Sequence, residues 1–221
     1  MMITTLQQIK KDPVISAYIQ KADEHLGAIG YTEHGFRHAG LVSNISQNIM
    51  LRLGYPERMA EMAAIAGYLH DIGNLVNRHD HGPNGAIMAL NYLLPNGFDP
   101  AEAAIIAGAI GNHEEESGEA VNNVAAALIL ADKSDVHRSR VRNSDLVTFD
   151  IHDRVNYAAV HSFLNVNEEK RSVTLELTIE TNICPVMEYF EIFLMRMMMC
   201  RRAATFLGCQ FKIEINGNKL L

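Results

Sequence analysis

A histidine and an aspartate end the most apolar helical stretch of the chain, which reads Ala-Ile-Ala-Gly-Tyr-Leu-His-Asp-Ile-Gly-Asn over residues 64–74. Burying His70 and Asp71 side by side without a partner would cost several kcal/mol. Adjacent helical residues point about 100° apart, so the two side chains can converge on one point from two directions. A metal ion at the end of a buried helix would satisfy both of them. Such an ion needs further ligands from elsewhere in the chain.

Histidine and aspartate recur in apolar helical surroundings, or at the start of a helix, at a few other places before residue 143. With the first pair, these residues are His38, His70, Asp71, His81, His113 and Asp132. Histidine nitrogen combined with carboxylate oxygen suits zinc, manganese, iron, cobalt or nickel and disfavours calcium. We therefore expect one or two divalent transition-metal ions as the cofactor, with magnesium as a further option.

Five short segments carry these residues in a fixed order. They are Phe36-Arg37-His38-Ala39, Leu69-His70-Asp71-Ile72-Gly73, His81-Gly82-Pro83-Asn84-Gly85-Ala86, Ile110-Gly111-Asn112-His113-Glu114 and Leu130-Ala131-Asp132-Lys133. One early histidine, a His-Asp doublet, two further histidines and a late aspartate form a pattern that resembles the HD-domain metal-dependent phosphohydrolases. The resemblance covers about residues 30–142.

This resemblance implies that one ion is held by four residues, namely His38, His70, Asp71 and Asp132. In family members with two ions, the aspartate that matches Asp71 bridges them, and the histidines that match His81 and His113 hold the second. The chain has both histidines, so we expect a dinuclear centre. The alternative is that His81 is an exposed residue at a helix start and His113 a cap at a helix end.

The pattern departs from the cyclic-di-nucleotide (HD-GYP) branch of the family in two respects. Asn112 occupies the first of two adjacent positions that usually hold histidines in that branch. The Gly-Tyr-Pro segment that follows there is also missing. Gly54-Tyr55-Pro56 precedes the His-Asp doublet, and we interpret it as a helix boundary.

Charged residues near the doublet and the closing aspartate are candidates for catalysis and substrate binding. Asp71 is placed to orient a nucleophilic water, and Lys133 could neutralise developing charge. If the helix that carries Lys133 continues, Arg138 and Arg142 share a face that could bind substrate phosphate. They could equally belong to a solvated helix end, where cations interact favourably with the helix dipole.

Two further side chains have an open role beside the expected ligands. His34 lies four residues before His38, so on a helix both point to the same side. We assign it to substrate binding, with ligation or support of a ligand as alternatives. Glu114 could orient a ligating imidazole or belong to an exposed acidic turn.

Capping and stop signals predict an all-helical bundle up to about residue 143. A capping aspartate precedes proline at Asp12-Pro13 and Asp99-Pro100, which is typical of helix starts. The expected helices span about residues 13–30, 36–53, 56–69, 83–94, 100–113 and 121–141. The helix that ends at residue 69 is apolar on nearly all sides, which predicts a central position.

The pattern changes beyond about residue 143. Residues 173–180 and 211–215 alternate between apolar and polar side chains, as half-buried strands do. A strand near residues 155–164, a turn at residues 165–170 and a Met-rich helix at residues 185–207 complete a β-β-α-β unit. We therefore predict a mainly α fold, with an HD-type helical domain over residues 1–143 and a small α+β domain over residues 144–221 packed on it.

Composition limits the partners and the compartment. A net charge of -7 argues against a nucleic-acid polymer as partner. No signal peptide or membrane-length apolar run is visible. Cys184, Cys200 and Cys209 show no Cys-x-x-Cys spacing, so we expect reduced, buried thiols and a cytoplasmic protein. The Met-rich residues 195–199 are interpreted as an adaptable core or as a homodimer surface.

The motifs and the resemblance favour a metal-dependent phosphohydrolase, a phosphomonoesterase or phosphodiesterase that acts on a nucleotide or another small phosphoester. Two alternatives stay open. A few HD-domain proteins are di-iron oxygenases, and a dinuclear His/Asp site meets their needs. A metal-stabilised sensor or binding protein with little turnover is the other, because small α+β units often dimerise or bind an effector. Fold resemblance alone does not specify the substrate.

Overall fold

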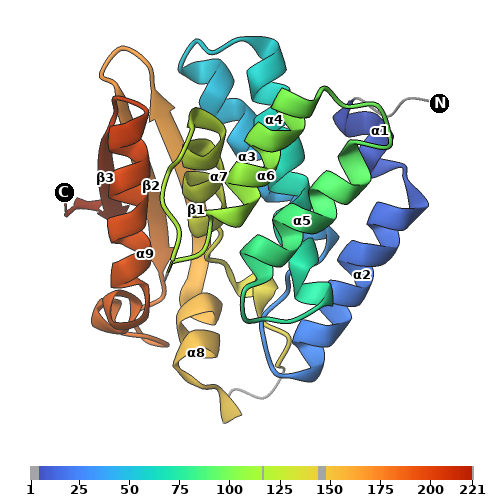
Figure 1. Cartoon of the computed structure of the whole chain (residues 1–221). Helices are drawn as coiled ribbons and strands as arrows, with labels where there is room; N and C mark the ends of the chain where they lie inside the picture. Colours follow the sequence, from blue (N-terminus) through green and yellow to red (C-terminus); the bar gives the residue numbers. More distant parts are fainter. Residues whose placement is uncertain (1–4, 116, 144–147, 221) are drawn as a thin grey trace.

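The computed structural model describes residues 5–115, 117–143 and 148–220, and the part before residue 143 is a bundle of helices (Figure 1). The helices are α1 (Leu6–Lys10), α2 (Pro13–Ala28), α3 (Phe36–Arg52), α4 (Glu57–Leu69), α5 (His81–Leu93), α6 (Pro100–Gly111) and α7 (Asn123–Lys133), with 3-10 turns η1 (Ile72–Leu75) and η2 (Arg138–Arg140). Asp12 and Asp99 cap α2 and α6 ahead of proline, as predicted.

Helix α4 is the centre of the bundle. Every residue from Met62 to Leu69 is buried, and α4 packs against α3, α6 and α7. Gly67 allows α3 to approach closely, since a Cβ at this position would lie 2.9 Å from the Cα of Ser43. This close approach places the end of α4 beside the first turn of α3, and so brings two predicted ligands, His70 and His38, together.

The chain after residue 148 forms the predicted β-β-α-β unit, preceded by one further helix. The elements are α8 (Ile151–Ala158), β1 (Ala159–Asn167), β2 (Ser172–Ile179), α9 (Val186–Phe206), β3 (Gln210–Ile215) and β4 (Asn218–Lys219). The sheet has the order β1-β2-β3-β4, in which β1 and β2 are antiparallel and α9 connects the parallel pair β2 and β3. The predicted fold class, a helical bundle with a small C-terminal α+β unit, is confirmed.

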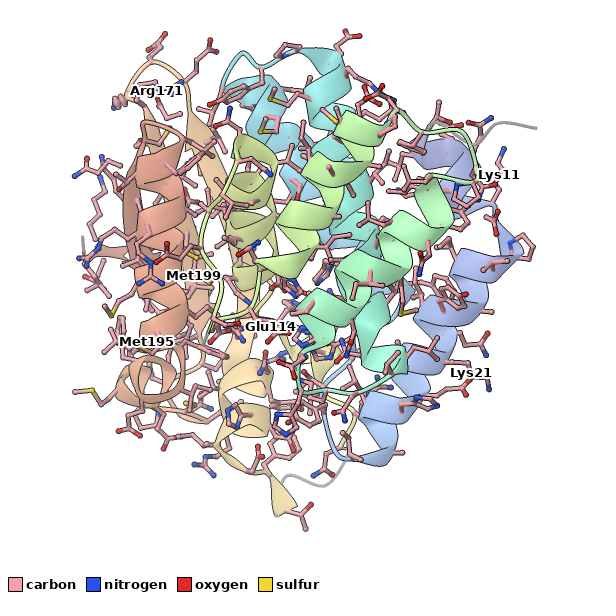
Figure 2. All side chains as sticks on the ribbon, in the orientation of Figure 1. Lys11, Lys21, Glu114, Arg171, Met195 and Met199 are labelled. Carbon is pink, nitrogen blue, oxygen red and sulfur yellow. The ribbon has the colours of Figure 1, made fainter. Side chains whose placement is uncertain are left out.

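Helix α9 joins the α+β unit to the bundle. It packs on β3 and β2 at one side and on α7 at the other, and it lies next to α7 in Figure 1. Its Met199 is buried, whereas Met195 points outward (Figure 2). One continuous apolar core extends from Ile9 of α1 to Ile215 of β3. Within the described residues, no helix is both long and apolar enough to cross a bilayer.

Two predicted boundaries are wrong. The helix expected over residues 121–141 ends at Lys133, because Ser134 caps it and its hydroxyl donates to the Ala131 carbonyl at 2.7 Å. The strand expected from residue 155 begins at residue 159, since residues 151–158 form α8. Asp150 starts that helix by accepting a hydrogen bond from the Asp153 amide.

Candidate metal centre

The ends of four helices and the first turn of a fifth meet at one buried point. His38 lies in the first turn of α3, His70 caps α4, His81 begins α5, and Asp132 lies in the last turn of α7. His113 follows the end of α6. Near Glu114, which is labelled in Figure 2, nitrogen and oxygen atoms gather between the helices. The structure therefore brings together all the histidines that the sequence predicts as ligands.

A glycine after the His-Asp doublet makes this convergence possible. Gly73 lies in η1, against the first turn of α5. A Cβ at this position would overlap the carbonyl oxygen of His81 and lie 2.5 Å from the Gly85 amide nitrogen. Since backbone atoms cannot move aside as a flexible side chain can, η1 and α5 reach this distance only because residue 73 is glycine. The contact brings His81 next to Asp71.

Hydrogen bonds donated by Nδ1 fix the orientation of three of the histidine rings. His70 Nδ1 donates to the Gly67 carbonyl at 2.9 Å, His81 Nδ1 to the Arg78 carbonyl at 3.0 Å, and His113 Nδ1 to the Ile110 carbonyl at 2.6 Å. A carbonyl can only accept, so each ring carries a proton on Nδ1. In the neutral ring, Nε2 then carries a lone pair that points into the site, as a metal ligand requires.

His38 receives the same support from a carboxylate. Its Nδ1 lies 2.7 Å from Oδ2 of Asp135, whose side chain is almost wholly buried. Arg37 and Arg140 hold this carboxylate in place, through Arg37 Nη2 at 2.7 Å and Arg140 Nε at 3.7 Å. Burial opposes the charge, but the bond to His38 and the two guanidinium groups keep the pKa of Asp135 well below its usual range. Asp135 therefore stays ionised and directs Nε2 of His38 inward.

The histidines form two pairs. Nε2 of His38 lies 3.2 Å from Nε2 of His70, and Nε2 of His81 lies 3.1 Å from Nε2 of His113. Burial lowers the pKa of His81 and brings that of His113 well below its usual value, which favours the neutral form of both rings of the second pair. Because their protons are on Nδ1, the facing Nε2 atoms cannot share a hydrogen bond. A cation coordinated by both would remove this repulsion.

Asp71 lies between the two pairs and turns one oxygen to each. Its Oδ2 is 3.2 Å from Nε2 of His70 and 3.6 Å from that of His38, while its Oδ1 is 3.5 Å from Nε2 of His81 and 4.0 Å from that of His113. Oδ2 is buried and has no hydrogen-bond partner among the described residues. A buried carboxylate oxygen without a partner is costly unless a cation compensates it.

The first pair is completed by a second carboxylate. Oδ1 of Asp132 lies 3.3 Å from Nε2 of His38 and 3.6 Å from Nε2 of His70. Burial would lower the pKa of His70, but the carboxylates of Asp71 and Asp132 raise it to about 10. These carboxylates thus favour positive charge at Nε2 of His70, where a proton and a divalent ion would compete for one lone pair.

The donor set fits a divalent metal ion. Among the residues that the structure describes, three buried groups could hold one, namely His38 with His70 and Asp71, His70 with His113 and Asp132, and Asp71 with His81 and His113. In each group the ligand atoms lie within 4.8 Å of one another. Imidazole nitrogen with carboxylate oxygen is the ligand combination of transition metals rather than of calcium.

A cleft of about 750 Å³ opens over the two pairs. The bundle supplies one wall, which includes Tyr31, His34 and Arg78, and α8 and α9 supply the other. Nδ1 of His34 donates to the Thr32 carbonyl at 2.7 Å, and its ring lies 5.4 Å from the ring of His38. The structure places His34 in the cleft beside the centre, where the sequence predicted a substrate contact.

Lys133 also lines the cleft, but its ammonium group is occupied by protein carboxylates. Nζ lies 2.7 Å from Oδ2 of Asp132 and 3.5 Å from Oε1 of Glu115. Its side chain is buried between α7 and the segment after α6. The contact with Asp132 leaves Oδ1 of that residue free to face the histidine pair.

Arg138 and Arg142 do not reach the centre. The prediction that they share a helix face is wrong because α7 ends at Lys133. Arg138 instead pairs with Glu180 at 2.6 Å and lies over the ring of Tyr157. Arg142 pairs with Asp23 near the end of α2. Neither residue lines the cleft.

Two residues of the site were not predicted as part of it, and a third had two possible roles. In the sequence, Asp135 is only one of several charged residues after the closing aspartate. Its burial depends on contacts with distant segments of the chain, so the sequence does not reveal it. Arg140 donates from all three guanidinium nitrogens to the carbonyls of Glu33 and Asp135, which ties the loop after α7 to the loop before α3. Glu114 contacts Nδ1 of His81 at 2.8 Å, so it orients an imidazole rather than belonging to an exposed turn.

The ordered ligand residues and their geometry agree with a comparison of the sequence with protein-family models, in which the HD domain matches residues 35–143. This chain contains an HD domain. All six predicted ligands lie within the matched segment, whereas α8 and α9 lie outside it. HD domains bind divalent metals, and membership supports a metal-dependent hydrolase at the level of the family.

Among solved structures, the chain is similar to a predicted HD superfamily hydrolase from an uncultured Thermotogales bacterium, known from a crystal structure at 1.45 Å resolution. The two chains are 24% identical with a TM-score of 0.45, over 56% of this chain and 67% of the other. No curated protein matches the sequence.

Replacing Asp135 tests the role of the carboxylate behind His38. Asp135→Asn keeps the shape of the side chain but removes the charge that holds Nδ1 of His38. We expect the affinity for a divalent ion to fall by about 10- to 100-fold, as for other partners of metal-bound histidines. Competition with a chromophoric chelator measures the dissociation constant. Unchanged affinity in a folded variant would show that Asp135 serves only the fold.

Proposed function

We propose that the protein is a metal-dependent phosphohydrolase with a dinuclear centre. Asp71 is assigned as the bridging ligand, His38, His70 and Asp132 as ligands of the first ion, and His81 and His113 as ligands of the second. The observation that carries this proposal is the geometry of His81 and His113, whose Nε2 atoms face each other at 3.1 Å while both Nδ1 atoms donate to backbone carbonyls. Two lone pairs that face each other at this distance repel, and a cation shared by both would remove the repulsion.

The residues around the centre are suited to hydrolysis of an anionic ester. Bound divalent ions would supply Lewis acidity at a phosphoryl oxygen and lower the pKa of a bound water molecule to about 7. Asp71 lies between the histidine pairs and can accept a hydrogen bond from a nucleophilic water. This hydrogen bond would orient the water. His34 presents an unprotonated Nε2 at the cleft wall and can accept a hydrogen bond from a substrate hydroxyl.

The size of the cleft favours a small substrate. Its volume of about 750 Å³ is in the range of pockets for nucleotides and other compounds of that size. Cationic side chains, among them Arg78 and Arg196, face it alongside the ligands. We therefore assign the substrate to nucleotides or other small phosphoesters, either monoesters or diesters.

A panel assay of the purified full chain tests this activity. The protein is stripped with chelator and reloaded with manganese, zinc, iron, cobalt or nickel under anaerobic conditions. It is then tested against nucleoside monophosphates, p-nitrophenyl phosphate and bis(p-nitrophenyl) phosphate. We expect turnover of at least one ester class that depends on metal and continues without oxygen.

Two results would contradict the proposal. Turnover that requires oxygen, with consumption of oxygen by the iron-loaded protein, would favour a di-iron oxygenase. No hydrolysis above background by fully loaded protein would favour a metal-stabilised sensor or binding protein.

A further inference from the structure

Helix α9 contributes a wall of the cleft although it lies outside the HD domain. Ile192, Phe193 and Arg196 line the cleft from this helix. In Figure 1, α9 stands beside α7, the helix that carries Asp132, with α8 below it. The α+β unit therefore adds a chemical group of its own to the site of the bundle, and that group is the guanidinium of Arg196.

Two contacts fix the position of Arg196. Its Nε donates to Oε1 of Glu115 at 2.8 Å, and the centre of its guanidinium lies 4.2 Å from the ring centroid of Phe193. The side chain is 20% exposed. A guanidinium held by one nitrogen and supported by an aromatic ring is preorganised, so it loses little conformational freedom when it binds a ligand.

The two terminal nitrogens of Arg196 are available to a ligand. Neither Nη1 nor Nη2 has a hydrogen-bond partner among the described residues. Other cleft cations differ in this respect. Arg140 donates from every guanidinium nitrogen to a backbone carbonyl, and the ammonium of Lys133 is shared by Asp132 and Glu115. Arg196 is thus the cleft cation on the Asp132 side whose terminal nitrogens, Nη1 and Nη2, remain unused within the described chain.

The same contacts place Arg196 close to the metal centre. Oε1 of Glu115 accepts from Arg196 and lies 3.5 Å from Nζ of Lys133, which in turn lies 2.7 Å from Oδ2 of Asp132. Arg196 is therefore connected to a candidate metal ligand through two intervening side chains. Arg78, in contrast, lies at the opposite histidine pair, with Nη1 at 3.5 Å from Nε2 of His81.

We propose that Arg196 binds an anionic oxygen pair of the substrate's phosphoryl group through Nη1 and Nη2, and that Lys133 positions Asp132 instead of contacting substrate. The parallel donors of a guanidinium match two oxygens of a phosphate, whereas an ammonium acts as a point charge. This inference rests on the proposed phosphohydrolase function. It makes α9 a determinant of substrate binding, supplied by a part of the chain that the HD domain does not include.

Binding of inorganic phosphate to the manganese-loaded full chain tests the inference without turnover. Arg196→Met keeps an aliphatic stem over Phe193 and removes the guanidinium. We expect its phosphate affinity, measured by calorimetry, to be about 10- to 100-fold weaker than that of the unmodified chain, the range for hydrogen bonds to charged groups. Metal content is measured alongside and should stay within error, since Arg196 is not a ligand, and a cooperative thermal unfolding transition shows that the variant is folded.

Two further variants separate recognition from net charge and from folding. Arg202→Ala removes one positive charge from the exposed side of the same helix and should leave phosphate affinity unchanged. Arg196→Lys keeps the charge and loses the paired donors, so we expect an affinity between those of the unmodified chain and Arg196→Met. In a hydrolytic assay, Arg196→Met should raise KM by a similar factor.

The two proposals fail in different ways. Normal phosphate affinity and KM in Arg196→Met, while the unmodified chain hydrolyses phosphoesters, would overturn the role of Arg196 and leave the proposed function standing. Loss of bound metal in Arg196→Met, with affinity restored by added metal, would also overturn it, because the residue would then act on the centre. Arg196-dependent phosphate binding without any hydrolysis would support the anion site and contradict the hydrolytic function.

Discussion

Asp71→Asn should lower kcat/KM for phosphoester hydrolysis by about 1,000-fold or more. Asp71 supplies one oxygen to each histidine pair, so the change removes a negative charge that both candidate ion positions share. Interactions of this kind are worth several kcal/mol in the transition state, and each 1.36 kcal/mol corresponds to about tenfold in rate. Steady-state kinetics of metal-loaded protein measures the loss, and mass spectrometry of the metals should show fewer ions per chain.

A matched substitution elsewhere controls for the chemical change itself. Asp12 caps α2 far from the cleft, at a position where asparagine caps as well as aspartate. Asp12→Asn should therefore keep full activity and metal content. If Asp71→Asn retained activity within tenfold of the unmodified chain, Asp71 could not be the bridging ligand.

Gly73→Ala should destabilise the fold by about 3 kcal/mol or more and weaken the second metal position. The added Cβ would overlap the His81 carbonyl oxygen, and the Gly85 amide lies 2.5 Å away. Overpacking costs about 1–3 kcal/mol where side chains yield, and here the obstacle is backbone. Relief requires η1 and α5 to separate, which moves His81 away from Asp71. Urea unfolding of chelator-treated protein measures the stability, and metal titration measures the second site.

Gly40→Ala provides the opposite case within the same bundle. Gly40 lies within α3, and a Cβ there would meet nothing within 4 Å. Since glycine in a helix interior costs about 0.5–1 kcal/mol relative to alanine, this variant should be more stable by that amount. Equal stability of the two alanine variants would contradict the close packing assigned to Gly73.

The sequence predicted the elements that carry strong local signals. The aspartate and proline at residues 12–13 and 99–100 determine where α2 and α6 begin, and the alternation over residues 173–180 gave the second strand to within a residue. The candidate ligands could be identified because each lies in a short segment with an ordered pattern. The ligands converge because the helices pack closely. In the sequence, glycines such as Gly67 are the only sign of this packing.

The remaining features depend on contacts between distant segments. Helical character was predicted to continue past Lys133, but Ser134 caps α7 there, so Arg138 and Arg142 lie beyond the helix and do not share a helix face. Asp135 gains its role from residues about a hundred positions away in the chain, such as His38. Arg196 could not be assigned to the cleft from the sequence, because its Met-rich surroundings indicate only a packed helix.

Anomalous X-ray scattering from crystals of the manganese-loaded protein tests the central claim most directly. The account predicts two peaks per chain, about 3.5–4 Å apart as in other two-metal sites. One should lie among His38, His70 and Asp132, the other between His81 and His113, with Asp71 between the peaks. A single peak at the first position would contradict the dinuclear centre. No peak in either position, from protein shown to be folded and exposed to excess metal, would contradict the metal site as a whole.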